Sequence, residues 1–358
     1  MIPKILHIAW KFDEDSTSLS EIDESKSDNY FFAFKNRNKL VKSKTLFKGF
    51  GYFFGVCFYL LNKIKCKIRL GNTDQLTSLL NRNIVNEFAI RFLIWKYDFS
   101  EVRIHWVGYG FLPTASIVSL SRFSDVTVFH HDWYHFTGGV HVPVISRNMF
   151  SVLESSFGLL SGLKNKAITH VFVSNFQEKL LRNLHLSNFT IQENQLRPAF
   201  SSARLEEPSR VFFDNRLKKG DDIFIMFIGV TSGNCDNKGV STVSSILNCL
   251  DNERVFSIGV GCDNSINFDL SIPRADPKFI FKLLSLIDLC VITSRLETFS
   301  MVALESQFCG TPVVYRRSLA PSSFKNRNFL YPAIDDSDRS LCFEVKKRLY
   351  TKRESLND

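Results

Sequence analysis

The sequence lacks any closely spaced pair of cysteines. Its 358 residues include eight Cys, and none has the C-x-x-C spacing that is typical of a zinc or redox site. Several stand inside apolar runs, among them Cys290 and Cys309. Because buried cysteines of this kind behave as small apolar side chains, we expect reduced thiols in a reducing compartment.

Long apolar runs, low-complexity tracts and a secretory leader are also missing. The run at residues 49–61 is uncharged, but its 13 residues are too few where a bilayer core needs about 20. The first ten residues alternate as a strand does and do not resemble the apolar centre of a signal peptide. The composition, 44% hydrophobic and 23% charged, is that of a globular protein. We therefore expect a cytoplasmic protein of two domains.

Acidic residues are absent between residues 35 and 69, where ten Lys or Arg occur. This block accounts for the net charge of +9, so the sequence does not indicate a uniformly basic, nucleic-acid-binding surface. Lysines flank the aromatic run at residues 49–61 on both sides. Two interpretations stay open: the segment lies in the headgroup layer of an anionic membrane, or it is a buried helix or strand pair with a basic rim.

Strand-like and helix-like stretches alternate through most of the chain. The continuous apolar run at residues 223–230 is typical of a parallel strand that is covered on both faces. The pattern predicts an α/β protein with two doubly wound, Rossmann-like parallel sheets. Expected strands are 4–10, 103–107, 125–130, 169–174, 223–230, 255–261, 289–293 and 312–315; expected helices are 75–97, 116–122, 177–186, 239–250, 277–286 and 301–308.

The charged stretch at residues 204–222 is the best candidate for a linker. It divides the chain into an N-terminal domain, residues 1–205, and a C-terminal domain, residues 206–358. In such folds ligands bind beyond the carboxyl ends of the strands, so we expect a site in a cleft between the domains.

Two acidic residues stand eight apart in the segment TSRLETFSMVALESQFCGTPVV, which begins at Thr293. Glu297 lies at a strand-to-helix turn, and Glu305 follows two turns into the helix on a similar face. Carboxylates there can accept hydrogen bonds from pairs of sugar hydroxyls. From the spacing alone, two Glu residues are more often a helix cap and a surface residue.

The segment resembles the signature of the large retaining GT-B glycosyltransferases, S-x-x-E-x-F-G-x-x-x-x-E-A-x-x-x-G-x-P-V. Ser300 and Ser306 stand where a Gly and an Ala are usual. The matching residues are Ser294, Glu297, Phe299, Glu305, Gly310, Pro312 and Val313.

This resemblance implies roles for four residues. Glu305 would bind the ribose of a donor nucleotide, and Glu297 would face the donor sugar or phosphate. The backbone amides of Thr298 and Phe299 would approach the diphosphate at the start of the helix.

A second segment, FHHDWYHFTGGVH, begins at Phe129 and resembles the H-D-M-W-x-F-T-G-G-C-H stretch of a bacterial subgroup associated with colanic acid and other surface polysaccharides. The resemblance implies that His131 lies near the reacting sugar and the acceptor, and that further residues shape the acceptor side. A structural hydrogen-bond cluster and a zinc site are the alternatives for a loop rich in His. The acceptor-side residues are Asp132, Thr137, Gly138, Gly139 and His141.

A third match is partial. The family usually has F-x-G-R…R-K-G, and here Gly229, Lys238 and Gly239 agree with it. Lys238 would contact the donor diphosphate. Val230 and Asn237 stand at the two arginine positions, and Arg295 and Arg197 are candidates to supply the missing charge.

Other features depart from the family. Residues 11–16 replace the usual glycine-rich loop after the first strand, and Arg316 begins the stretch that replaces a glycine pair. Only 43 residues follow Tyr315, so we expect a shortened C-terminal end.

The implied activity is transfer of a sugar from a nucleotide-diphosphate sugar to a glycan or lipid-linked glycan, without a metal cofactor. The implied setting is bacterial surface polysaccharide synthesis, with contact to an anionic membrane through residues 35–69. Two alternatives remain: a degenerate, non-catalytic GT-B subunit that binds a partner or the membrane, and a GT-B nucleotide-sugar epimerase.

Overall fold

The computed structural model divides into two compact units, Met1–His141 with Ile145–Gln195, and Val142–Val144 with Leu196–Asp358. The predicted boundary between residues 205 and 206 lies outside the residues that the structure describes. Those residues are 4–12, 28–36, 84–105, 112, 114–131, 166–174, 188–194, 196, 223–230, 238–251, 253–273, 275–295, 297–317 and 329–357.

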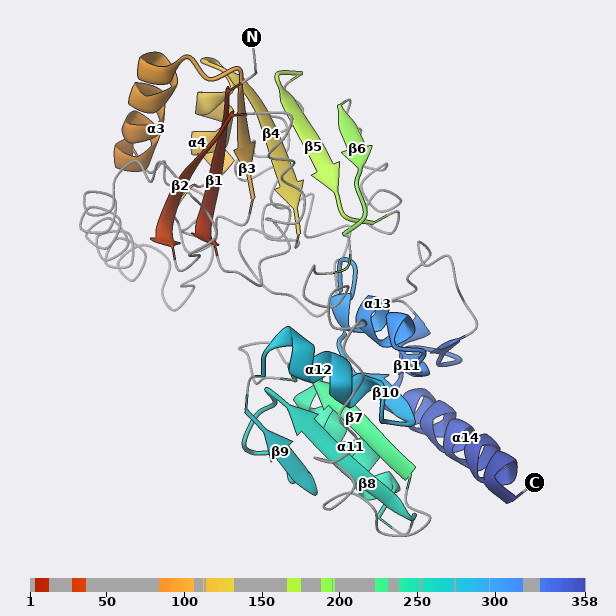
Figure 1. Cartoon of the computed structure of the whole chain (residues 1–358). Helices are drawn as coiled ribbons and strands as arrows, with labels where there is room; N and C mark the ends of the chain where they lie inside the picture. The colour runs from red at the N-terminus through yellow and green to blue at the C-terminus, as the bar shows by residue number, and fades with distance from the viewer. Residues whose placement is uncertain are drawn as a thin grey trace, which may run out of the picture. The chain divides into compact units, whose positions relative to one another are not determined.

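The first unit contains a parallel sheet of six strands in the order β2-β1-β3-β4-β5-β6 (Figure 1). Every pairing between neighbours is parallel. Parallel strands need crossover connections, which the alternating sequence pattern provides. The strands are β1 (Lys4–Phe12), β2 (Asp28–Asn36), β3 (Glu101–Ile104), β4 (Asp125–His130), β5 (Ile168–Phe172) and β6 (Phe189–Ile191).

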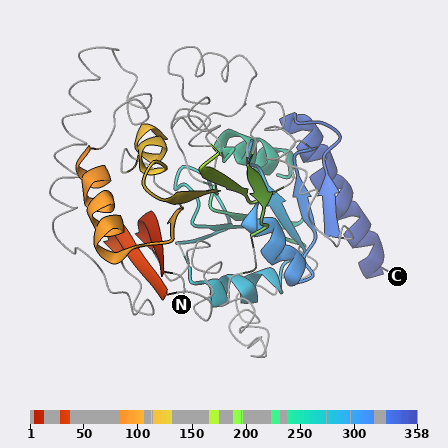
Figure 2. The ribbon, with the colours of Figure 1, turned by 90° about the horizontal axis from the view of Figure 1, so that it is seen from above.

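Helices α3 (Ile84–Tyr97) and α4 (Thr114–Leu120) lie side by side against this sheet (Figures 1 and 2). Their inward-facing apolar residues form one core with the strands. Ile90 and Leu93 of α3 and Ile117 of α4 are almost wholly buried there.

The second unit contains another parallel sheet of six strands, in the order β12-β11-β10-β7-β8-β9. This is the strand order of a dinucleotide-binding sheet, and the order reverses between β7 and β10. The strands are β7 (Ile223–Ile228), β8 (Val255–Val260), β9 (Leu270–Ile272), β10 (Leu289–Ile292), β11 (Val313–Tyr315) and β12 (Leu330–Pro332).

Helices cover both faces of the second sheet. Successive side chains of a strand point to opposite faces of the sheet. Val291 of β10 therefore packs in the core with α11 (Val240–Cys249) and α14 (Asp338–Asn357). Its neighbour Cys290 lies on the other face, toward α13 (Met301–Phe308). Helix α12 (Pro277–Leu284) packs beside α13, and Figure 2 shows α11 and α12 on opposite sides of the strands.

Local sequence signals explain where two of these helices begin or end. The Asp276 side chain accepts a hydrogen bond from the Phe279 amide at 3.0 Å, and Pro277 follows as the first helical residue of α12. Gly310, with φ of 76°, ends α13 as the sequence predicts.

The structure corrects the expectation that all cysteines are free. Cys249 of α11 and Cys342 of α14 are joined as a disulfide. They lie 93 positions apart in the sequence, and the packing of α11 against α14 brings them together. Among the described residues, Cys262, Cys290 and Cys309 are free thiols.

The prediction of two doubly wound parallel sheets is confirmed. Five elements were not predicted: strands β2, β6, β9 and β12, and helix α14. Strand β12 and the 20-residue α14 occupy the stretch after Tyr315.

Most of the basic, aromatic segment at residues 35–69 lies outside the described residues. Within the part of the chain that the structure does describe, no helix is long and apolar enough to cross a membrane.

Candidate functional site

Gly239, at the entry to α11, lies where no other residue would fit. Its φ is 72°, and a Cβ atom there would stand 2.4 Å from the carbonyl oxygen of Thr293. The Thr293 hydroxyl in turn donates a hydrogen bond to the carbonyl of Lys238 at 2.7 Å. The loop before α11 is therefore fixed against the loop after β10.

Lys238 and Glu297, which are 59 positions apart, form an ion pair between these two loops. The Lys238 Nζ lies 2.6 Å from Glu297 Oε1. The lysine side chain is 43% exposed and the carboxylate 18% exposed, so both remain open to a ligand. The structure thus brings together two of the residues predicted from the sequence.

The turn that leads into α13 carries backbone strain. Ser300 has φ of 55°, and its side-chain oxygen accepts a hydrogen bond from the Ala303 amide at 3.4 Å. This left-handed conformation explains why a glycine suits the position in the resembling family. Thr298 and Phe299 come directly before it, at the positive end of the helix dipole.

Glu305 lies on α13 and is only 2% exposed. Burial raises the pKa of the Cys290 thiol to about 12, and the charge of the neighbouring Glu305 contributes to the rise. Burial likewise raises the pKa of Cys309 to about 11, with Glu305 again contributing. The two acidic residues of the motif therefore differ: Glu297 is partly open and Glu305 is enclosed.

Arg316, which replaces the usual glycine pair, is buried behind this site. Its Nε donates to the Thr293 carbonyl at 3.2 Å, and Nη2 donates to the Thr242 hydroxyl at 2.7 Å and pairs with Asp338. Burial alone would raise the pKa of Asp338, but hydrogen bonds from Arg316 and Thr242 hold it below its usual value. Arg316 therefore links the ends of β10 and β11 to the starts of α11 and α14.

Arg295, proposed from the sequence as a second cation, lies near the same place. Its Nη2 is 3.3 Å from the Ser241 hydroxyl and 3.9 Å from Asp338 Oδ2. Its side chain is 37% exposed. Val230 stands where the resembling family has an arginine. It is apolar and buried, so this position supplies no positive charge.

Gly229, Lys238 and Glu297 share one edge of the second sheet. Gly229 follows β7 with φ of 66°, Lys238 precedes α11, and Glu297 follows β10. Because every strand pairing described in this sheet is parallel, these are all carboxyl ends, and β7 and β10 flank the point where the strand order reverses. That point is where nucleotides bind in such sheets.

In the first unit, histidines and a phenylalanine stack across three strands. His7 of β1 lies 3.1 Å from His105, between ring nitrogens, and His105 stacks on Phe129 with centroids 4.6 Å apart. The His131 ring stacks in the same layer, 6.0 Å from His105 and 6.2 Å from Phe129. The neighbouring His130 faces the other way and lies 2.9 Å from His170.

Burial keeps this layer uncharged. Burial lowers the pKa values of His7 and His131 to about 4 each. For His131, a hydrogen bond with Asn194 acts in the opposite direction but is the smaller effect. The pKa of His105 is also lowered well below its usual value, by burial and by the neighbouring rings and Arg103. The sequence reasoning missed His7, although a polar residue inside an apolar first strand was a usable signal.

No protein-family model matches the sequence, and no curated protein matches it either. Solved structures do match. A glycosyltransferase from Rickettsia africae ESF-5 is 13% identical with a TM-score of 0.60, over 97% of this chain and 88% of that one. WaaG, a glycosyltransferase involved in lipopolysaccharide biosynthesis, is 13% identical with a TM-score of 0.60, over 97% and 90%. A structure from E. coli described as trehalose-6-phosphate bound with UDP-2-fluoro glucose is 9% identical with a TM-score of 0.62, over 97% and 91%.

The chain has the GT-B fold. Identities this low establish the fold alone.

Several predicted residues of this GT-B chain lie outside the described part. They are Arg197, Asn237 and the acceptor-side residues Asp132, Thr137, Gly138, Gly139 and His141. Within the described ranges, no group of three His, Cys, Asp or Glu residues is placed to hold a metal ion.

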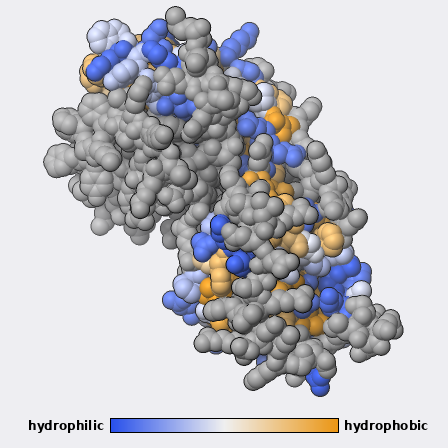
Figure 3. Space-filling view, viewed as in Figure 1, coloured by the Kyte–Doolittle hydropathy of each residue, from blue (hydrophilic) through white to orange (hydrophobic). Residues whose placement is uncertain are grey.

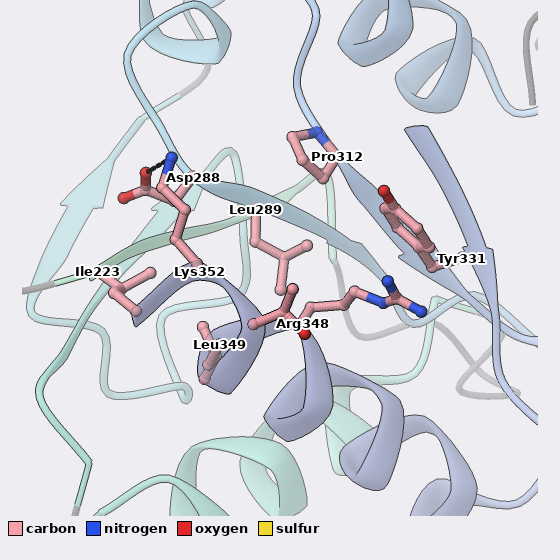
Figure 4. Close-up of a pocket in the computed structure, with 9 residues that line it drawn as sticks. Ile223, Asp288, Leu289, Pro312, Tyr331, Arg348, Leu349 and Lys352 are labelled. Atoms are coloured by element: carbon pink, nitrogen blue, oxygen red, sulfur yellow. Dashed lines mark ion pairs between the residues drawn. The ribbon is translucent and has the colours of Figure 1, made fainter. Parts of the chain in front are cut away.

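A hollow of about 180 Å³ lies at the opposite edge of the second GT-B sheet (Figure 4). Asp288 and Leu289 stand at the amino end of β10, and Lys352 of α14 pairs with Asp288 at 3.5 Å. The Arg348 guanidinium lies over the Tyr331 ring, 3.7 Å from its centroid. These contacts anchor α14 to the sheet, away from the carboxyl edge that carries Lys238.

Proposed function

We propose that this protein is a glycosyltransferase that moves a sugar from a nucleotide-diphosphate sugar to an acceptor hydroxyl, with retention of configuration. The Lys238–Glu297 pair at the carboxyl edge of β7 and β10 carries the proposal. It places a cation and a carboxylate where α/β sheets bind nucleotides. The shared fold, and the UDP-2-fluoro glucose in one solved structure, support it.

Sugar transfer from such a donor builds negative charge on the departing diphosphate. Lys238 and the amides of Thr298 and Phe299, at the start of α13, would stabilise that charge. Glu297 would accept hydrogen bonds from the sugar, and Glu305 from the ribose. We propose that no metal ion is required, so a chelator should leave the rate unchanged; loss of activity with EDTA and recovery with Mg²⁺ would contradict this.

On the acceptor side we propose His131 as a catalytic residue. Its lowered pKa, about 4, keeps the ring neutral at pH 7, so it can share a hydrogen bond with a sugar hydroxyl. Asp132, Thr137, Gly138, Gly139 and His141 would bind the acceptor beside it.

The acceptor is proposed to be a glycan or lipid-linked glycan of a bacterial surface polysaccharide, such as O-antigen, capsule or exopolysaccharide. The resemblance at residues 129–141 and the role described for WaaG support this. The enzyme would then act in the cytoplasm, at the inner face of the plasma membrane, with residues 35–69 toward the lipid.

Nucleotide binding tests the proposal. A donor at 100 times its dissociation constant should stabilise the protein by about 2.7 kcal/mol, which a thermal-shift screen of nucleotides and nucleotide sugars detects. Lys238→Ala and Glu297→Gln should each weaken donor binding by about tenfold or more. The matched control, Lys278→Ala on the exposed side of α12, should bind as wild type.

Turnover separates the alternatives. An epimerase converts the donor without any acceptor, and a non-catalytic subunit binds the donor without converting it. Unchanged binding in Lys238→Ala and Glu297→Gln would refute the donor site itself.

A further inference from the structure

Helices α11 and α14 meet along a seam that carries a covalent link. Cys249, the last residue of α11, is bonded to Cys342, which lies one turn into α14. We call the contact between these two helices the α11–α14 seam.

A polar contact joins the same two helices nearer their starts. The Thr242 hydroxyl of α11 donates a hydrogen bond to the Asp338 carboxylate of α14 at 2.9 Å. Thr242 stands seven positions before Cys249, and Asp338 four before Cys342, so each helix makes both links from one face. Apolar side chains of both helices pack along the seam in one core cluster, among them Val243, Ile246 and Leu341.

The polar end of the seam is connected to the loop that carries Lys238. Arg316 Nη2 donates to the Thr242 hydroxyl and pairs with Asp338, and its Nε donates to the Thr293 carbonyl. The Thr293 hydroxyl in turn holds the Lys238 carbonyl. A shift of α14 against α11 would separate Asp338 from Arg316 and Thr242, and it would loosen this chain of contacts.

The disulfide is accessible from one side. Cys249 is partly exposed, whereas Cys342 is largely buried. Helix α14 has a solvent-exposed face, on which the Phe343 side chain is 56% exposed, and Figure 3 shows a group of blue, hydrophilic side chains where Figure 1 places α14. An external thiol or disulfide can therefore react at the Cys249 sulfur, with Cys342 as the second partner.

The three other described cysteines are poor partners in such an exchange. Burial raises the pKa of Cys290 to about 12 and that of Cys309 to about 11, and it also raises the pKa of Cys262. Because the thiolate is the reactive form, these thiols exchange slowly at neutral pH. Among the described cysteines, exchange is therefore concentrated on Cys249 and Cys342.

The proposed cytoplasmic setting favours a reversible bond. Cytoplasmic thiols are kept reduced, and disulfides there are usually transient, catalytic or redox-sensing. This step, and the effect on donor binding, rest on the proposed function; the link between the two helices does not.

We propose that Cys249 and Cys342 form a redox switch. Oxidation fastens α14 to α11 and holds the Lys238 loop in the conformation that binds the donor. Reduction preserves the fold and loosens that hold.

The oxidant is a low-molecular-weight disulfide, RSSR. The Cys249 thiolate attacks one of its sulfurs, RS⁻ leaves, and Cys249 carries a mixed disulfide. The Cys342 thiolate then attacks the Cys249 sulfur, and the second RS⁻ leaves. The two protein sulfurs lose two electrons to RSSR, and the two thiol protons end on two RSH molecules.

Limited proteolysis of the full chain tests the switch without a nucleotide. Oxidised glutathione should give the bonded form and dithiothreitol the dithiol form, and alkylation followed by mass measurement counts the thiols. Trypsin should cut α14 after Lys346 or Lys347 about threefold faster or more in the dithiol form, because cleavage requires local opening of the helix.

Two variants serve as controls for the proteolysis. Cys249→Ser with Cys342→Ser should be cut at the dithiol rate under both conditions. The matched control Cys262→Ser should show the same difference between the two forms as wild type. The two wild-type forms give the comparison even if the double variant does not fold.

Nucleotide titration measures the effect on the proposed donor site. UDP and GDP are titrated separately, and whichever binds should bind about three- to tenfold more tightly to the bonded form. If neither binds either form, the proposed donor site fails, and the cleavage rates still decide whether the switch exists.

Three results would overturn the switch: thiols that remain after oxidised glutathione, a bond that dithiothreitol does not reduce in the folded chain, or equal cleavage rates in the two forms. Equal nucleotide affinities with unequal cleavage rates would overturn its link to the Lys238 loop.

Discussion

Arg316 shows how one buried side chain can hold several loops. Its guanidinium contacts the Thr293 carbonyl, the Thr242 hydroxyl and Asp338, and it also donates to the carbonyl of Asp336. Thr293 in turn abuts Gly239 and binds Lys238. Arg316, which stands where the resembling family has a glycine pair, therefore holds in place the loop that carries Lys238 of the proposed donor site. Arg316 does not itself lie in that site.

We expect Arg316→Met to lower the free energy of unfolding by about 2–4 kcal/mol, because it removes several buried hydrogen bonds and leaves Asp338 without its main partner. Urea denaturation measures this. The neighbouring Arg317→Met is the control: Arg317 is exposed, and its loss should cost about 0.5 kcal/mol or less. Equal effects of the two substitutions would show that Arg316 has no special role.

At the scale of elements, the turns at the ends of α11 and α13 differ in what surrounds their glycines. Gly239 and Gly310 have similar positive φ values, 72° and 76°. A Cβ on Gly239 would meet a backbone carbonyl, whereas a Cβ on Gly310 would meet nothing within 4 Å. Alanine substitutions at these two glycines therefore separate the cost of backbone strain from the cost of steric contact.

Gly310→Ala should cost about 1 kcal/mol, the strain of a left-handed alanine. Gly239→Ala should cost clearly more, and it should also weaken donor binding, because the loop that carries Lys238 must move away from Thr293. Denaturation and nucleotide titration of both variants give the comparison. If Gly239→Ala binds the donor as tightly as Gly310→Ala, the close packing at Thr293 is not needed for binding.

At the scale of the whole molecule, the buried histidine layer makes stability depend on pH. His7 and His131 have pKa values of about 4 in the folded protein, against about 6.5 unfolded. The unfolded chain therefore binds more protons between pH 6.5 and pH 4, so stability is full above pH 6.5 and falls as the pH drops through that window.

At pH 5 each of these two histidines should cost roughly 2 kcal/mol of stability. Urea midpoints at pH 7 and pH 5 measure the loss, and His131→Gln should reduce the difference between them. A wild-type midpoint that does not change between pH 7 and pH 5 would contradict the buried, neutral layer.

Much of the second sheet was predictable because its signals are local. Residues 289–315 contain an apolar run, a helix that ends at Gly310 and a second apolar run, and β10, α13 and β11 agree closely with that pattern. Strands β6, β9 and β12 have three residues each, too few to show a period, and unlike the three-residue β11, which is buried throughout, each includes an exposed residue. Helix α14 had a usable signal in Leu341, Val345 and Leu349, which are buried at helical spacing.

The sequence by itself determined the alternation of strands and helices, the acidic motif and the lysine that precedes α11. Tertiary structure alone decided that Lys238 meets Glu297 across 59 positions, that Arg316 supports their loops and that His7 joins the layer containing His131. Side chains from distant segments become neighbours because a parallel sheet gathers the carboxyl ends of its strands at one edge. No local pattern records which of those ends will be adjacent.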